Sequence, residues 1–496
     1  MFDYGVYAAD QSGYDPRDGD MDLGRGVGWN RDAAEYFGRG DWLYVYSGGT
    51  NGTRPAGPSA STMFPWGGQA VLRNDYLADG SQIWLWTKLG AYGSSGHAHR
   101  AKLAVNLRAY GSMLLVDSGR FQYNGVGLSK QIHDHYEQGT NAHNTLTIDA
   151  KPQSNTPALA KSPLPNSSWS FGEAEDSLHA SMSDWEGLAG KATHSRGVVF
   201  RKQSQAGLPP YFLVVDRVEP GDRSRLVTAN WHAHPNSTVK LPADTRTATI
   251  RGVDPATMSP TSAELLLVAA SGQQGEGIGR FNSSEIVKGR SCPAGDGAEQ
   301  GKDHCVWQGW YSQDYNGHLP APTLVFSTEI PAGSATTFGW LLLPRKHRTE
   351  PAPAASVRLE GISHGVIKAS VTIGDAHEKV EVRLGASASA SAKTDDDDHD
   401  DDAGSGPADA GRIVRCSNLA DCTHDLQTAI NSGDDIELAP GVWTVEPIFF
   451  TSNNQTVTFG PEVSVVAKRG SQAFGVLFTA NGTRGLSECS NGRLGL

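Results

Sequence analysis

The chain has 496 residues, of which 38% are hydrophobic, and a formal net charge of -12 at pH 7. Seven of its acidic residues lie in one run, DDDDHDDD at residues 395–402, and no basic stripe is present, which argues against nucleic acid as a partner. No apolar stretch reaches the roughly 18 residues that a membrane span needs, and the N-terminal residues lack the apolar core of a signal peptide.

The cysteines and glycosylation sequons favour an oxidising compartment. Cys292 and Cys305 flank a Gly-rich insertion, and Cys416 and Cys422 flank a short polar loop, so each pair is a candidate disulfide. Free thiols in a cytosolic protein are the alternative. The chain also has sequons of the form N-x-S/T, at Asn51, Asn166, Asn236, Asn282, Asn454 and Asn481. We expect a secreted or luminal protein whose export signal is not present in this chain.

The first predicted element is a short amphipathic helix at residues 31–44, RDAAEYFGRGDWLY. A single helix cannot bury its own apolar face. It therefore either packs on the following domain or is the last piece of a helical domain.

From about residue 66 to residue 384 the pattern changes to short β-prone runs separated by Gly, Pro, Asn and Asp. They include QIWLWTKLG, KLAVNLRAYGSMLLVDSG, YFLVVDRVEP, RLVTANWHAH, PTLVFSTEI, TTFGWLLLP and EKVEVRLG. More than ten such runs with almost no helical periodicity predict a large antiparallel β-sandwich. The aromatic residues near 64–86 are expected in its core rather than on a sugar-binding platform.

Residues 386–411, ASASASAKTDDDDHDDDAGSGPADAG, cannot bury enough apolar area to order themselves and are predicted to form an acidic disordered linker. Calcium binding by the Asp run is the alternative, but the run lacks the Gly turn and terminal Glu of an EF-hand loop. The stretch THDLQTAINSGDDIELAPGVWTV then predicts a short helix, a Gly turn, a strand and a PG turn. This order resembles the opening of a right-handed parallel β-helix of the pectate-lyase type, so residues 412–496 are expected to form a partial β-helix.

The segment GHAHR places His97 and His99 two residues apart, at the mouth of a predicted β-hairpin. Residues i and i+2 of an extended strand point to the same side, so the two imidazoles would share one face of a sheet. That arrangement suits a metal site, a proton-transfer site, or both. Two hydrogen-bonded surface histidines are the alternative.

Four stretches follow one another in the chain: STMFPWGGQAVLRNDY, GHAHRAKLAVNLRAYGSMLLVDSGRFQY, GTNAHNTLTID and VTANWHAHP. This series resembles the C-terminal β-sandwich of the heparinase II/III-like polysaccharide lyases, a group that includes alginate and oligoalginate lyases and is related to dermatan sulfate epimerase. The resemblance covers about residues 30–385. It implies a β-supersandwich at residues 46–385, preceded at residues 1–45 by a remnant of an (α/α) toroid domain.

The resemblance also implies a site. It makes His97 the catalytic candidate and makes His99, Asp117 and His143 the ligands of a mainly structural Zn²⁺ or another divalent ion. Two imidazoles, a carboxylate and a water form an ordinary tetrahedral zinc set. Taken alone, Asp117 before Ser-Gly is equally a turn residue, and His143 a polar residue at a strand entry.

Two features of the sequence do not match a simple version of this site. With a hairpin turn centred near Gly111, Asp117 lies opposite Val105 and far from His99, so the site needs a bulge or a loop that folds back. The family often has H-R-D-K where this chain has HRAK. The resulting Ala101 removes a carboxylate that would orient an imidazole.

Three further residues are candidate substrate contacts. Arg73 could pair with a uronate carboxylate, or else it is a framework ion-pair residue. Tyr123 and Tyr136 are candidate substitutes for a tyrosine that relatives take from the toroid, or else they are structural.

Other histidines in the chain are expected to have lesser roles. The HDH at residues 133–135 is read as a loop near the site, with a competing metal pair as the alternative. His232 and His234 are expected to be structural.

The sequence therefore predicts a polysaccharide lyase that acts on an acidic polysaccharide, alginate-like or glycosaminoglycan-like. Cleavage would proceed by β-elimination next to a uronic acid, and the absence of a toroid in this chain would leave the site incomplete. One alternative is a uronate C5 epimerase, because the same proton abstraction followed by reprotonation inverts that centre. The other is a catalytically silent polysaccharide-binding module or a truncated gene model.

Overall fold

The computed structural model describes residues 2–384 except for residues 18, 20, 25–29, 77–78, 91–96, 122–125, 155–162, 244–245, 273–276, 293–304, 316 and 348–351, and beyond residue 384 it describes seven strands between residues 412 and 480. The chain divides into two compact units, Met1–Ala392 and Lys393–Leu496. The predicted linker at residues 386–411 lies outside the described residues.

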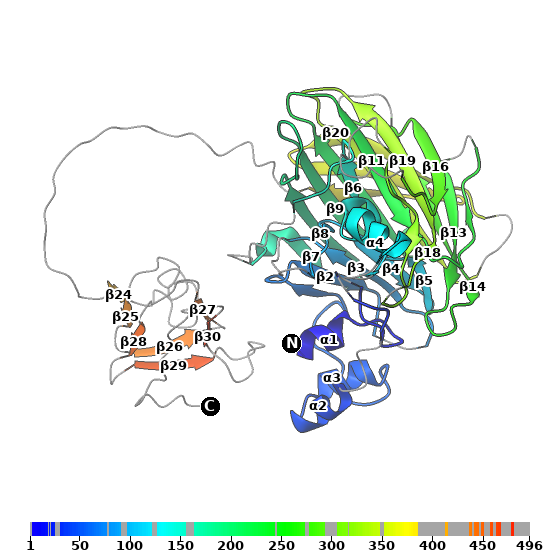
Figure 1. Cartoon of the computed structure of the whole chain (residues 1–496). Coiled ribbons are helices and arrows are strands. Elements are labelled where there is room, and N and C mark those ends of the chain that lie inside the picture. Colours follow the sequence, from blue (N-terminus) through cyan, green and yellow to red (C-terminus); the bar gives the residue numbers. More distant parts are fainter. Residues whose placement is uncertain are drawn as a thin grey trace, which may run out of the picture. The chain divides into compact units, whose positions relative to one another are not determined.

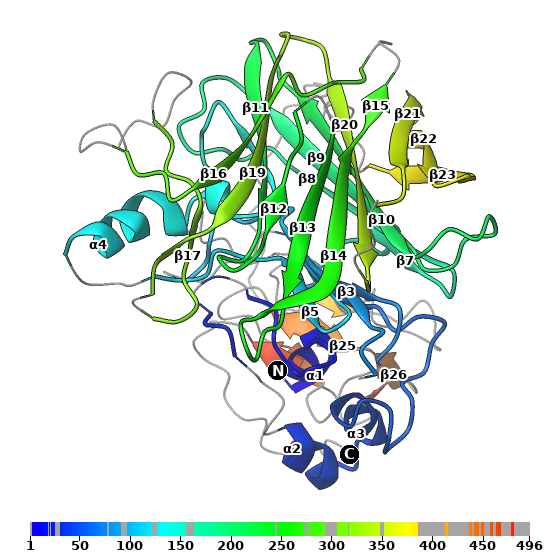
Figure 2. The same ribbon diagram turned by 90° about the vertical axis from the view of Figure 1, so that its right-hand side faces the viewer.

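The first unit is built on one large antiparallel sheet, whose central strands run side by side in Figures 1 and 2. In spatial order its strands are β1 (Thr62–Phe64), β2 (Gln69–Arg73), β3 (Ile83–Lys88), β4 (Val105–Ala109), β5 (Ser112–Leu115), β13 (Thr247–Val253), β14 (Pro260–Ala269), β20 (Thr336–Arg345), β10 (Tyr211–Glu219), β9 (Thr193–Arg201), β8 (Glu175–Met182) and β7 (Trp169–Phe171), with β12 (Val239–Lys240) paired to β13. Its central strands carry continuous apolar runs because other layers cover both of their faces.

A second antiparallel sheet covers one face of the first. Its strands are, in order, β16 (Ser283–Lys288), β19 (Pro322–Ile330), β11 (Arg225–His232) and β6 (Leu146–Ile148). One hydrophobic core joins the two sheets, and the rings of Trp231 on β11 and Trp340 on β20 meet in it edge to face at 5.2 Å. This packing confirms the predicted antiparallel sandwich.

A third layer covers the other face of β9, β10, β14 and β20. It consists of β15 (Ser271–Gly272), β21 (Ala355–Ser363), β22 (Val366–Ile373) and β23 (Ala376–Arg383), which share a second core with the large sheet. The contact is close, because a Cβ added to Gly197 on β9 would lie 2.3 Å from the carbonyl oxygen of Arg383. The unit is therefore a three-layered sandwich. A short pair, β17 (Trp310–Tyr311) and β18 (Leu319–Pro320), lies outside these sheets.

The N-terminal segment forms helices α1 (Phe2–Ala8), α2 (Asn30–Tyr36) and α3 (Gly40–Tyr46). The prediction of one helix over residues 31–44 is wrong, because the chain turns between α2 and α3 at Gly38, which has a φ of +64°. Among the described helices, none combines the length and apolar character that crossing a membrane requires.

The start of the chain packs against the first strands of the large sheet, where Figure 1 shows α1 near the ends of β2–β5. The indole of Trp84 on β3 donates a hydrogen bond to the carbonyl oxygen of Ala8 at 3.0 Å. Tyr7 and Trp42 form a small core with Tyr76, which follows β2. The N-terminal segment therefore packs on the following domain, and its origin as a remnant of an (α/α) toroid at residues 1–45 stays a prediction.

The second unit contains short strands that pair in parallel. They are β24 (Arg412–Val414), β25 (Ile436–Leu438), β26 (Gly441–Val445), β27 (Ile448–Phe450), β28 (Val457–Phe459), β29 (Val463–Ala467) and β30 (Phe478–Ala480). Strand β25 pairs with β28, β26 with β29 and β27 with β30. Two successive passes of three strands pair in this way in a parallel β-helix, although the β-helix itself stays a prediction.

Candidate functional site

The loop before β4 carries the two histidines of GHAHR. His97 is exposed in a turn and His99 is buried, so the expectation that they share one face of a strand is wrong. The chain is not extended here, because Ala101 donates a backbone hydrogen bond to the carbonyl of His99 and Ala104 donates one to Ala101. Leu103 adopts a φ of +64°. These tight turns fold the loop back before the strand begins.

Asp117 lies just after β5, on the second strand of the same hairpin. Leu107 pairs with Leu115 but Arg108 pairs with Met113, so β5 contains one extra residue and bulges. The carboxylate is fixed by the backbone N–H of Gly119, which donates to Oδ1 at 3.0 Å. The hairpin thus has both devices that the sequence argument required, a bulge and a folded-back loop.

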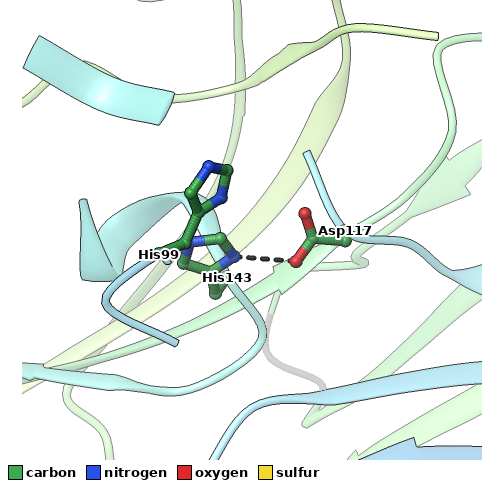
Figure 3. A group of neighbouring side chains, drawn as sticks. All are labelled: His99, Asp117 and His143. Carbon is green, nitrogen blue, oxygen red and sulfur yellow. Dashed lines mark hydrogen bonds and ion pairs between the residues drawn. The ribbon is translucent and has the colours of Figure 1, made fainter. Parts of the chain in front are cut away.

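His143 follows the 3₁₀ turn η3 (Thr140–Ala142) and completes a buried group with His99 and Asp117. Its Nδ1 lies 2.8 Å from Oδ2 of Asp117, and its ring centroid lies 5.3 Å from that of His99 (Figure 3). One ligand atom from each of the three side chains lies within 4.8 Å of the others. The structure therefore brings together the three residues that the family resemblance indicates as metal ligands.

The electrostatics and the donor set of this group suit a divalent cation. Burial alone would raise the pKa of Asp117, but the adjacent His143 and His99 imidazoles and the Gly119 N–H outweigh it and hold that pKa well below its usual range. The Nε2 atom of His143 is buried without a hydrogen-bond partner among the described residues. An ionised carboxylate and two imidazoles fit Zn²⁺, which takes nitrogen and oxygen ligands.

Glu137 is a buried carboxylate beside this group that the sequence argument missed. Helix α4 (Leu128–Ile132) continues as one π-helical turn, His133–Glu137, so the prediction of a loop at the HDH segment is wrong. Oε1 of Glu137 lies 3.8 Å from Nε2 of His99, and Oε2 lies 2.8 Å from Nδ1 of His133. A carboxylate behind a ligating histidine fixes the orientation of its ring. Glu137 thus places near His99 the acidic group that Ala101 lacks.

The signal for Glu137 was present as the spacing HDHYE. In a helix, residues four apart are neighbours, so His133 and Glu137 form a pair. What the spacing does not show is that this turn lies against the loop of His99. His135, between them, stacks on Trp307 with ring centroids 5.9 Å apart.

Asn144, the next residue after His143, joins three strand ends. Its side-chain amide donates to the carbonyl oxygens of Val105, at the start of β4, and Val116, just after β5. Its Oδ1 accepts the backbone N–H of His232, the last residue of β11, at 2.6 Å. Burial, with the nearby His143, lowers the pKa of His232 to about 4, so this imidazole stays neutral.

Arg196 on β9 binds the backbone next to the histidine group. Its Nη1 donates to the carbonyl oxygens of Leu103 and Asn144 at 2.5 and 2.9 Å. Its other nitrogens form a bidentate pair with Asp216, at 2.7 and 3.0 Å. All of these groups are buried, so the loop carrying His99 and the segment carrying His143 are held by one cation.

Two of the other predicted site residues are described: Tyr136 lies near Asp117, and Arg73 contacts the N-terminal segment. Arg73 is buried and donates to the backbone carbonyls of Tyr7 and Ala9, so its framework role rests on backbone hydrogen bonds and not on the predicted ion pair. Burial lowers its pKa to about 10. Tyr136 is buried on the π-helical turn, and burial raises its pKa. Tyr123 lies outside the described residues.

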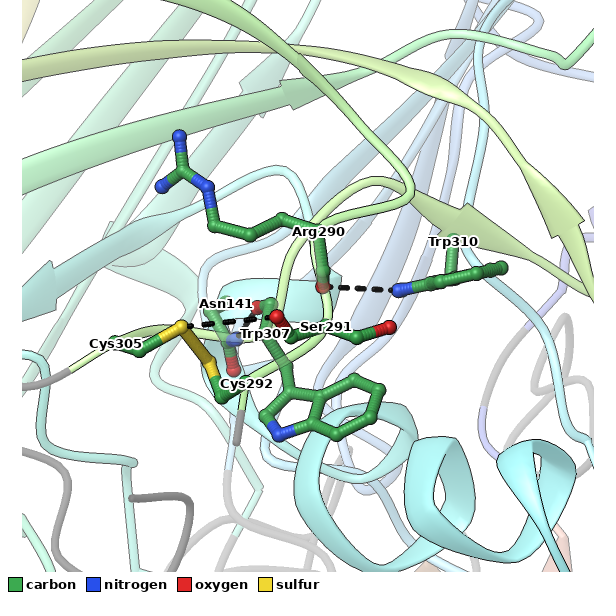
Figure 4. The surroundings of a disulfide bond; sticks show 7 residues. All are labelled: Asn141, Arg290, Ser291, Cys292, Cys305, Trp307 and Trp310. Atoms are coloured by element: carbon green, nitrogen blue, oxygen red, sulfur yellow. Dashed lines mark hydrogen bonds between the residues drawn. A yellow bond between two sulfur atoms is a disulfide. The ribbon is translucent and has the colours of Figure 1, made fainter. Parts of the chain in front are cut away.

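A disulfide stabilises the segment that contacts the residues next to His143 (Figure 4). Cys292 and Cys305 are bonded, with Cα atoms 5.5 Å apart, which confirms the first predicted pair. The segment after Cys305 contacts the site, because Asn141 donates from Nδ2 to the carbonyl of Trp307 at 2.6 Å. The second predicted pair, at residues 416 and 422, lies outside the described residues.

The described part of the first unit is thus a layered antiparallel β-sandwich domain with a buried His–Asp–His group at the end of a bulged hairpin. The sequence model described as heparinase II/III-like, C-terminal, matches residues 56–341. The chain belongs to this family, as the sequence motifs predicted.

Solved structures share the fold. A heparinase III gene product has a TM-score of 0.58 at 17% identity, over 76% of this chain and 51% of its own. The heparan sulfate lyase HepC from Pedobacter heparinus has a TM-score of 0.58 at 18% identity, over the same shares. A further heparinase III has a TM-score of 0.54 at 15% identity, over 77% of this chain and 52% of its own. The chain thus spans about half the length of these structures. No curated protein matches the sequence.

Proposed function

We propose that this chain carries the β-sandwich part of a polysaccharide lyase that cleaves an acidic, glycosaminoglycan-like polysaccharide by β-elimination. The observation that carries the proposal is the exposed His97, held two residues from the buried group of His99, Asp117 and His143. Membership of the heparinase II/III-like family supports the reaction class. Alginate is the other candidate polymer from the sequence.

The chemistry sets three requirements. The enzyme must neutralise the uronate carboxylate, remove the weakly acidic C5 proton and protonate the departing glycosidic oxygen. His97 would contribute to proton transfer or to recognition of the carboxylate. Its imidazole is exposed, and its backbone lies against the N-terminal segment, because a Cβ at Gly19 would lie 2.2 Å from the carbonyl oxygen of His97.

His99, Asp117 and His143 would hold the divalent ion, with Glu137 behind His99. When bound, the ion supplies a fixed positive charge and ties the loop to the hairpin. The residues of this chain then have separate tasks. Glu137 would orient His99, Asn144 would fix the backbone beside His143, and His97 would face the substrate.

We also propose an extracellular or luminal location. The disulfide between Cys292 and Cys305 supports an oxidising compartment. The sequons that fall among the described residues are all exposed, at Asn51, Asn166, Asn236 and Asn282.

The test is the ultraviolet absorbance of unsaturated uronate after the full chain is incubated with heparan sulfate, other glycosaminoglycans and alginate. We expect absorbance to rise with the wild type, to be lost with His97→Ala and to persist with His377→Ala, which removes an exposed histidine on β23. Deuterium from solvent entering an uncleaved polymer would instead indicate the epimerase. Binding without either signal would indicate a silent module and contradict the proposal.

A further inference from the structure

A polar pocket lies between β14 and β20 of the large sheet and β16 and β19 of the second sheet. It has a volume of about 240 Å³, and its lining includes Arg246, Arg280, Phe281, Asn282, Ser283 and Ser284. None of the lining residues belongs to the loops that carry His97, His99, Asp117 or His143. The pocket is therefore a different site from the histidine group.

The two arginines bring unbalanced positive charge into this pocket. Arg246 donates one hydrogen bond, from Nη1 to the carbonyl of Ala270 at 3.1 Å. Among the described residues, neither Arg246 nor Arg280 forms an ion pair with a carboxylate, and the described lining contains no Asp or Glu. Burial, followed by the neighbouring Arg280 charge, lowers the pKa of Arg246. Two guanidinium groups side by side without a carboxylate favour an anion between them.

The rest of the lining suits a sugar. Phe281 is half-buried and stacks on Phe338 with ring centroids 4.5 Å apart, and both rings belong to the lining, so the pocket also offers an apolar surface. The aliphatic face of a sugar ring packs on such a surface, while serine hydroxyls and an amide bind its hydroxyl groups. A sulfate or carboxylate on the same sugar meets the guanidinium planes.

We propose that the Arg246–Arg280 pocket binds the sulfate or carboxylate group of an acidic saccharide, at a position separate from the histidine group. The choice of saccharide rests on the proposed function, whereas the anion site rests on the pocket itself. The site would hold a second stretch of the polymer.

The experiment measures saccharide binding by titration calorimetry at fixed ionic strength, using full chain made without N-glycans so that Asn282 is bare. The probes are a sulfated heparan tetrasaccharide, an alginate tetrasaccharide and inorganic sulfate. The test variant is Arg246→Ala/Arg280→Ala. The control variant, Arg223→Ala/Arg358→Ala, removes the same charge from exposed positions outside the pocket.

We expect the test variant to lose one binding site per chain, or to bind at least about tenfold more weakly, while the control stays close to the wild type. Greater loss with the heparan probe assigns a sulfate, and greater loss with alginate assigns a carboxylate. A lysine double variant keeps the charge but lacks the planar fork, so its affinity should be intermediate. An unchanged melting temperature of the test variant separates this effect from misfolding.

The outcomes distinguish this inference from the proposed function. Equal loss in test and control variants, or no loss in either, overturns the pocket whatever the lyase assay shows. Binding of inorganic sulfate as tightly as the saccharides overturns the assignment to a sugar. Loss confined to the test variant supports the pocket even when no polymer yields unsaturated product.

Discussion

Nδ1 of His143 lies 2.8 Å from Oδ2 of Asp117, and both side chains are buried. A carboxylate this close either shares a metal ion with the imidazole or accepts its N–H and leaves the other nitrogen for the metal. In both arrangements the aspartate is needed. The two differ in how much metal affinity survives when its charge is removed.

The first prediction follows from that difference. The wild type should bind one divalent ion per chain, measured by elemental analysis, and His99→Ala and His143→Ala should lose it. Asp117→Asn should lose the ion completely if Asp117 is a ligand, or bind it about 10- to 100-fold more weakly if it orients His143. Chelation should lower the melting temperature of the wild type. Equal metal content in all variants and in a His377→Ala control would exclude the site.

Glu137→Gln should weaken metal binding about 10- to 100-fold, because a neutral amide orients the imidazole of His99 less firmly than a carboxylate does. Competition with a metal-sensitive dye measures the affinity. Glu186→Gln is the matched control, since Glu186 pairs with Arg100 next to His99 but is exposed. A merely structural Glu137 would change the melting temperature of the chelated protein and leave the affinity of the folded protein unaltered.

Arg196→Met should destabilise the first unit by about 3–5 kcal/mol, because the buried Asp216 loses its cationic partner and keeps only the hydrogen bonds of His194 and Trp340. Urea denaturation followed by tryptophan fluorescence measures this loss. The double variant Arg196→Met/Asp216→Leu should recover part of it, since no unpaired charge remains. If the double variant is as unstable as the single one, the hydrogen bonds to the Leu103 and Asn144 carbonyls matter more than the ion pair.

Stability should also fall in mild acid because of His234. Burial, and then the nearby Arg17 charge, lower its pKa from 6.5 to about 4 in the folded protein. Between these values the unfolded chain binds the proton more readily, so stability is complete above pH 6.5 and falls as the pH drops toward 4. The loss for this residue is about 3 kcal/mol. Melting temperatures from pH 7 to 4.5 should fall less steeply for His234→Gln than for the wild type or the exposed control His377→Gln.

Removing the disulfide should cost about 3 kcal/mol, since it closes a loop with a sequence separation of 13 residues. Cys292→Ser/Cys305→Ser and the reduced wild type should show the same decrease in the free energy of unfolding. Metal binding should weaken as well, because the segment after Cys305 holds Asn141 beside His143. Full metal affinity in the double variant would show that the disulfide does not contribute to the geometry of the metal site.

Local sequence patterns and motifs were enough to predict many strands and the three ligand residues. They were not enough to predict the side chains that surround the ligands. The stretch PTLVFSTEI coincides with β19, because a run of β-branched and apolar residues between turn residues has few other ways to fold. The family motif predicted His99, Asp117 and His143 as ligands. Their proximity depends on a bulge in β5 that the hairpin sequence alone does not reveal. Glu137 was missed because its partner is distant in the chain. The burial of Arg73 under α1 depends on tertiary packing in the same way.

The hydrogen bonds of Asn144 also determine what deamidation of this side chain would do to the site. Its amide nitrogen faces two carbonyl oxygens and its oxygen faces a backbone N–H. Deamidation to aspartate would keep the shape of the side chain, yet it would exchange two attractive contacts for two repulsive ones between strands β4 and β5. The outer sandwich layers would be untouched. Protein deamidated at Asn144 would therefore lose the geometry of its histidine group while its overall β structure stayed intact.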